Sequence, residues 1–119
     1  MRVQIFAPQA SIGTNNIAVL STHCETFLVS VGVIVGGTSP NLTYSVEYCL
    51  EPLNEEPNAY GGTVWTAANA NWLTLPGMSA QTTTQAVTIQ GPCCAIRLNV
   101  TAYSSGSARL EVVQSGRGN

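Results

Sequence analysis

The chain has 119 residues, of which only 8% are charged, about a third of the roughly 25% that is typical of soluble domains. Its charged side chains are six Glu and four Arg, neither Lys nor Asp occurs, and the formal net charge is −2. This composition argues against nucleic acid or an anionic membrane surface as partner, because both require a basic patch. The 45% hydrophobic content argues against disorder.

The length indicates a single domain that comprises residues 1–119. A small domain with so few ionised groups tends to self-associate, so we expect a partner to cover part of its surface. The longest apolar run, 27–35, is much shorter than the roughly 20 residues of a membrane helix. Because the N-terminus lacks the pattern of a secretory signal, we expect a protein made and retained inside the cell, without a membrane partner.

The first part of the chain has the periodicity of strands. Short strands are predicted at 3–6 and 17–22, followed by a longer one at 26–35. This longer strand is apolar at nearly every position, which indicates a central strand with both faces covered. A turn cluster at 36–41 leads into 42–50, where apolar and polar residues alternate as in a half-buried strand.

The middle of the chain is predicted to begin with an irregular segment. Residues 51–62 hold half of the acidic residues and two prolines, and they predict a long exposed acidic loop. Further short strands are expected at 63–66, 71–75 and 83–90.

The C-terminal part predicts a β-hairpin, 94–103/107–114. Apolar and polar residues alternate in both segments, and Gly106 lies in the short turn between them. Pairing Tyr103 with Ser107 places apolar residues opposite each other on one face, a register that a one-residue slip would spoil. Residues 115–119 are expected to form a flexible tail.

About eight short strands at roughly ten-residue spacing, without a helical pattern, indicate an all-β fold. We expect residues 1–119 to form one antiparallel β-sandwich or jelly-roll-like domain, with a small barrel as the other possibility. The periodicity alone does not define the order of the strands.

The residue types that catalysis needs are scarce. With one His and no Asp or Lys, a nucleophilic triad would have to join His23 to a Glu. The candidate acid pairs, Glu47 with Glu51 and Glu55 with Glu56, are explained more simply by a solvated acidic surface. We therefore expect no enzymatic activity, no catalytic residue and no cofactor.

The four cysteines are expected to be free thiols that pack as small apolar residues, because no signal directs the chain to an oxidising compartment. They are Cys24, Cys49, Cys93 and Cys94. Three potential metal ligands cluster only at 23–25, where consecutive strand residues would point to opposite faces. No metal site is expected.

Tyr60, Trp65 and Trp72 lie within thirteen positions of one another, near several Asn residues. Such a group fits three roles: filling the core, anchoring a protein interface, or forming a platform on which a sugar stacks. The sequence leaves these three roles open.

Residues 95–114, AIRLNVTAYSSGSARLEVVQ, resemble the C-terminal hairpin of small virion proteins encoded by tailed bacteriophages. In those proteins the hairpin follows a strand similar to residues 44–50, YSVEYCL, and a loop that carries Trp, the order found here. The resemblance covers about residues 42–114, and the chain departs from it in the two adjacent cysteines that precede Ala95.

The resemblance implies a non-enzymatic structural protein of the phage particle, located in the virion and assembled in the host cytoplasm. Within that class it favours a capsid decoration, or cement, protein that binds the major capsid protein and forms homo-oligomers, with a trimer favoured. The alternatives are a head–tail or tail-associated adaptor, and a carbohydrate-binding or receptor-binding β-sandwich module. The expected interface residues are Val3, Phe6, Tyr60, Trp65 and Trp72.

Overall fold

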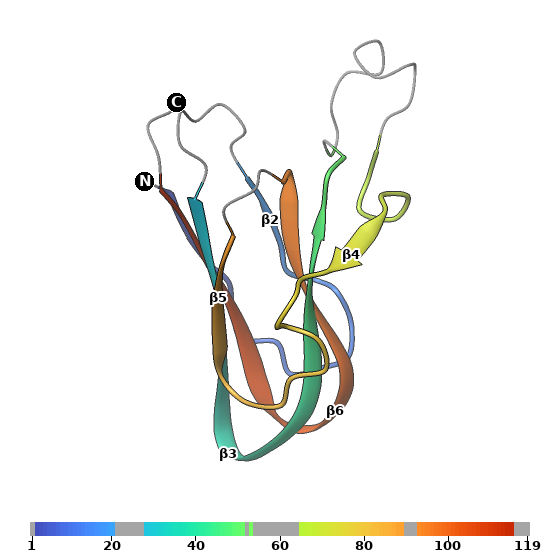
Figure 1. Cartoon of the computed structure of the whole chain (residues 1–119). Helices are drawn as coiled ribbons and strands as arrows, with labels where there is room; N and C mark the ends of the chain where they lie inside the picture. The colour runs from blue at the N-terminus through green and yellow to red at the C-terminus, as the bar shows by residue number, and fades with distance from the viewer. Residues whose placement is uncertain (1, 21–27, 52, 54–64, 90–92, 116–119) are drawn as a thin grey trace.

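The computed structural model describes residues 2–20, 28–51, 53, 65–89 and 93–115, and this part of the chain is all-β, with no helix (Figure 1). Its strands pair antiparallel in one curled sheet. They are β1 (Arg2–Ile5), β2 (Ile17–Val19), β3 (Leu28–Cys49), β4 (Trp72–Thr74), β5 (Gln85–Ile89) and β6 (Ala95–Ser115). The prediction of an all-β antiparallel fold is confirmed.

The two longest strands form the centre of the sheet. β3 has 22 residues and β6 has 21, and they pair from Leu28 with Ser115 to Cys49 with Ala95. Register shifts near Gly36 and Asn41 mark the point where both strands bend together, at the lower end of Figure 1. The paired ribbon therefore doubles back on itself, and its two halves face each other.

The remaining strands lie along the two edges of this ribbon. β1 and β2 pair with opposite ends of β6, and β5 and β4 pair with opposite ends of β3. The first half of the ribbon thus has the order β1–β6–β3–β5, and the second half has the order β2–β6–β3–β4. Isolated bridges, including Gln9 with Ala108 and Tyr44 with Gln81, continue both edges towards the bend.

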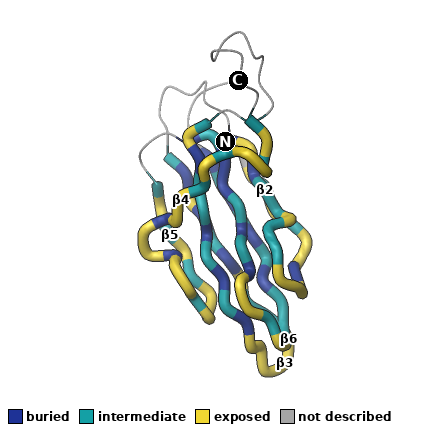
Figure 2. The backbone as a smooth tube through the Cα atoms, turned by 90° about the vertical axis from the view of Figure 1, so that its right-hand side faces the viewer, coloured by how far each residue is buried: buried dark blue, intermediate teal, exposed yellow. Residues whose placement is uncertain are grey.

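The core lies between the two halves. Alternate residues of β3 and β6 are buried, and Figure 2 shows exposed residues gathered at the bend and along the edges. Full burial of an aliphatic side chain stabilises the fold by about 1.5–3 kcal/mol. Among the fully buried residues of this one cluster are Val29, Val31, Val33, Tyr44, Val46, Leu98, Val100, Leu110 and Val112.

The predicted hairpin 94–103/107–114 is wrong. Both segments belong to β6, and each of them pairs with β3 instead of with the other segment. Because β1 and β2 occupy the opposite edge of β6, the two halves of β6 meet only through their inward side chains. β6 does change direction near Gly106, which adopts a positive φ of 90°, but this is a bend in one continuous strand and not a hairpin turn.

Other boundaries differ in detail. The predicted strands 26–35 and 42–50 are the two halves of β3, and Ser115, assigned to the flexible tail, is the last residue of β6. Most of the predicted acidic loop 51–62 lies outside the described residues, as do residues 116–119.

Candidate functional site

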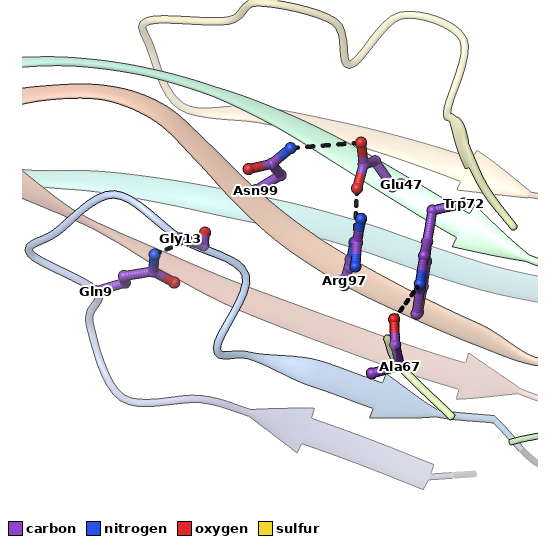
Figure 3. Close-up of polar contacts among 7 residues, drawn as sticks. All are labelled: Gln9, Gly13, Glu47, Ala67, Trp72, Arg97 and Asn99. Carbon is purple, nitrogen blue, oxygen red and sulfur yellow. Dashed lines mark hydrogen bonds and ion pairs between the residues drawn. The ribbon is translucent and has the colours of Figure 1, made fainter. Parts of the chain in front are cut away.

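A polar and aromatic cluster lies on the outer face of the second half of the ribbon (Figure 3). The β3–β6 register places Glu47 directly opposite Arg97, and Arg97 Nε donates to Glu47 Oε1 at 2.6 Å. Asn99 Nδ2 donates to the other carboxylate oxygen at 3.4 Å. The Glu47 and Arg97 side chains are only 15% and 17% exposed, so water screens this ion pair weakly.

Trp72 lies beside this ion pair and comes from the neighbouring strand β4. The Arg97 guanidinium carbon lies 4.3 Å from the centroid of the Trp72 ring, a cation–π arrangement. The indole Nε1 donates to the carbonyl oxygen of Ala67 at 3.0 Å. One ring face and the N–H of Trp72 are therefore engaged within the chain.

The segment that leads to Trp72 is held by hydrogen bonds of its own. Both oxygens of the Glu51 carboxylate accept from Asn71, one from the backbone N at 2.7 Å and one from Nδ2 at 2.8 Å. These two hydrogen bonds lower the pKa of Glu51, because they favour its charged form. A turn in which Thr66 N donates to Asn69 Oδ1 precedes them.

This arrangement fixes the 65–75 segment against the sheet. The contacts of Glu47, Arg97 and Trp72 join β3, β6 and β4, and Trp72 is outside the main core cluster of the described residues. A sugar could stack only on the ring face that Arg97 leaves open. The geometry thus favours a structural role for Trp72.

The cysteines of the described residues lie near the ends of β3 and β6. Cys49 and Cys93 are buried free thiols, and the half-buried Cys94 donates from its thiol to the carbonyl oxygen of Leu50 at 3.3 Å. Burial raises the pKa of Cys49 and raises that of Cys93 to about 12, so both thiols stay neutral and are weak nucleophiles. Cys24 lies outside the described residues, as does the predicted ligand cluster 23–25.

These pKa shifts predict a loss of stability at alkaline pH. Burial also raises the pKa of Tyr44 to about 12, and its hydroxyl donates to the carbonyl oxygen of Thr83 at 2.6 Å. Because the folded-state pKa values exceed the unfolded ones, the stabilisation is complete below about pH 9 and declines as the pH rises towards 12. We expect the free energy of unfolding in urea to fall over this range, by at most about 1.4 kcal/mol per pH unit for each group.

Tyr44→Phe removes one of the three titrating groups, Tyr44, Cys49 and Cys93, and keeps the ring. We expect this variant to be less stable at pH 8, since the Thr83 carbonyl loses its donor, but to depend less on pH above about pH 10. Parallel pH profiles of the variant and the parent protein would contradict the assignment to Tyr44.

The predicted interface residues occupy different environments. Val3 is 50% exposed at the edge strand β1, whereas Phe6 is half-buried and packs against the core. Trp65 is half-buried and forms a bridge with Leu53, apart from the core cluster of the described residues. Tyr60 lies outside the described residues.

Sequence reasoning did not single out three further aliphatic side chains near the N-terminus. Ile5, Ile12 and Val19 are 62%, 63% and 46% exposed. Alternation with Val3 would have placed Ile5 on the same face. The exposure of that face depends on the position of β1 at the sheet edge, which periodicity does not show.

Comparison of the chain with models of protein families, with curated proteins and with solved structures finds no match. In the part of the chain that the structure describes, no group of three or more His, Cys, Asp or Glu side chains is placed to hold a metal ion. Nor do these residues include a helix long and apolar enough to cross a membrane.

Proposed function

We propose that the protein is a non-enzymatic structural subunit of a bacteriophage particle, and within that class a capsid decoration protein. It would bind the major capsid protein and other copies of itself. The observation that carries the proposal is the exposure of branched aliphatic side chains along residues 2–19. Val3, Ile5, Ile12 and Val19 are each 46% to 63% exposed, and exposed apolar side chains favour burial against a partner.

We further propose that the fold is a jelly roll. When each half of β3 and β6 is counted separately, the described strands comprise eight segments in two groups of four, β1–β6–β3–β5 and β2–β6–β3–β4. A long antiparallel ribbon folded over so that its halves face each other is the arrangement of jelly rolls, which occur in viral capsid proteins and in lectins. The fold supports a virion role by analogy only.

Mass spectrometry of particles from bacteria that produce the chain tests the virion role. We expect a copy number comparable with that of the major capsid protein. Particles that lack the chain are expected to release their DNA at a lower temperature, and added purified protein should restore the original temperature. Absence of the chain from purified particles would refute the proposal, and a copy number of only a few per particle would favour the adaptor role.

The alternative of a carbohydrate-binding module rests on the half-buried Trp65 and Trp72 and on the amides of Asn71 and Asn99. We expect no binding on a glycan array, because Trp72 is engaged by Arg97 and both amides donate to Glu carboxylates. Glycan binding that Trp72→Ala abolishes in a folded variant would favour the carbohydrate-binding role.

A further inference from the structure

In the part of the chain that the structure describes, the outer face of the first half of the ribbon, on the left in Figure 1, has no segment packed over it as residues 65–75 are packed over the second half. Cross-strand pairs place its residues on one face: Ile5 with Glu111, Glu111 with Gly32, and Arg109 with Ile34. Val3 lies on the same face, two residues before Ile5. We call this surface the open face and define it by Val3, Ile5, Gly32, Ile34, Arg109 and Glu111.

The open face is apolar around one ion pair. Val3, Ile5 and Ile34 are 50%, 62% and 37% exposed. Arg109 Nη2 lies 2.7 Å from Glu111 Oε2, with side chains 41% and 30% exposed. The sequence predicted that the apolar strand 26–35 is covered on both faces, yet within the described chain Ile34 remains exposed on this one.

The residues of the open face are complementary to themselves. Gly32 and Glu111 form one row across β3 and β6, and Ile34 and Arg109 form the next row. Consider a two-fold axis that is parallel to the sheet, perpendicular to the strands and midway between these two rows. It places the Gly32–Glu111 row of one copy opposite the Ile34–Arg109 row of the second copy. Arg109 then faces Glu111 of the second copy, and Ile34 faces its Gly32.

Gly32 is not required by the packing of its own chain. A Cβ atom there would lie 3.8 Å from the Gln85 carbonyl oxygen and 3.9 Å from Ala86 Cβ, which are ordinary contacts. Its φ is not positive, so the backbone does not demand glycine either. The missing side chain leaves a hollow on the open face that Ile34 of a second copy could fill.

We propose that the open face binds a second copy of this chain in an isologous dimer with the two sheets packed face to face. The inference rests on the proposed function, because it locates the self-association that an assembly protein needs. It differs from the trimer that the resemblance implies, since the paired rows match under a two-fold axis.

Sedimentation velocity of the full chain at micromolar concentrations tests the dimer. We expect a species of twice the 12.5 kDa monomer mass. Arg109→Glu and Glu111→Arg should each weaken dimerisation at least about 100-fold, because like charges then face each other. An equimolar mixture of the two variants should form a heterodimer, since both cross-copy pairs again join opposite charges.

Two further variants separate loss of the interface from loss of the fold. Gly32→Val should keep the fold and its melting temperature but remain monomeric, because the added side chain fills the hollow. Ile5→Glu should be monomeric, whereas the matched control Ile12→Glu should still dimerise, since Ile12 is equally exposed but lies outside the open face.

A parent protein that is monomeric or trimeric at all concentrations would overturn the inference, as would a charge-variant mixture that does not associate. A monomer present at high copy number in particles would refute the dimer and leave the proposed function intact. A dimer absent from particles would refute the proposed function and leave the self-association intact.

Discussion

Replacement of Gly106 by alanine is expected to lower the free energy of unfolding by about 2–5 kcal/mol, measured by urea denaturation. The φ of Gly106 is 90°, a conformation that L-residues adopt only with strain. An added Cβ would also lie 2.6 Å from Pro40 Cβ, 2.8 Å from Pro40 Cα and 2.9 Å from the Gly36 carbonyl oxygen. The first of these atoms belongs to a rigid ring and the others to the backbone, so the clash cannot be relieved by a side-chain rotation.

Gly77→Ala is the matched control for this prediction. Gly77 has a similar φ of 84°, but a Cβ atom there would meet nothing within 4 Å. Its replacement therefore measures the backbone strain alone, for which we expect about 1–2 kcal/mol. Equal losses for the two variants would show that the contact with Pro40 does not limit the bend.

The large effect at Gly106 follows from its place in the fold. The bends of β3 and β6 lie against each other, and a Cβ on Gly37 would approach Gly106 Cα to 3.0 Å. Both halves of the ribbon contribute buried residues to the same core, which closes only when both strands turn back together. A side chain at this point would therefore oppose core formation as a whole.

The position of the strands could be predicted from the sequence, whereas their partners could not. The alternation of apolar and polar residues located both halves of β6. Pairing these halves with each other satisfied both faces, because it placed apolar residues opposite apolar ones on one face and polar residues opposite polar ones on the other. Pairing with β3 satisfies them equally well, for example Val33 with Leu110 and Val46 with Leu98. Since β3 and β6 are distant in sequence, local periodicity does not distinguish the two solutions.

The same limit applies to the candidate site. Alternation placed Glu47 and Arg97 on the polar faces of their strands, but the predicted pairing of Tyr103 with Ser107 would have placed Arg97 diagonal to Glu111. The structure pairs Arg97 with Glu47, and Glu111 with Arg109. Trp72 stacks on Arg97 because β4 pairs with β3. The sequence of residues 65–75 does not indicate which strand β4 pairs with.

Replacement of Arg97 by alanine is expected to lower the free energy of unfolding by about 2–4 kcal/mol. The change leaves the Glu47 carboxylate, which is only 15% exposed, without its guanidinium at 2.6 Å, and it removes the cation that lies over the Trp72 ring. An unpaired charge in a poorly solvated position costs more free energy than an exposed ion pair contributes to stability. Trp72 fluorescence should also change, because the indole loses its closest cation.

Arg109→Ala supplies the matched control, since Arg109 lies on the same strand and is also paired with a Glu, at 2.7 Å. Its side chain is 41% exposed, and for such pairs the expected loss is about 0–1 kcal/mol. Stability should be compared at protein concentrations below those at which the chain self-associates, because Arg109 belongs to the open face. If Arg97→Ala costs no more than Arg109→Ala, the Glu47–Arg97–Trp72 cluster does not stabilise the fold, and its arrangement on the sheet would then point to a ligand or partner instead.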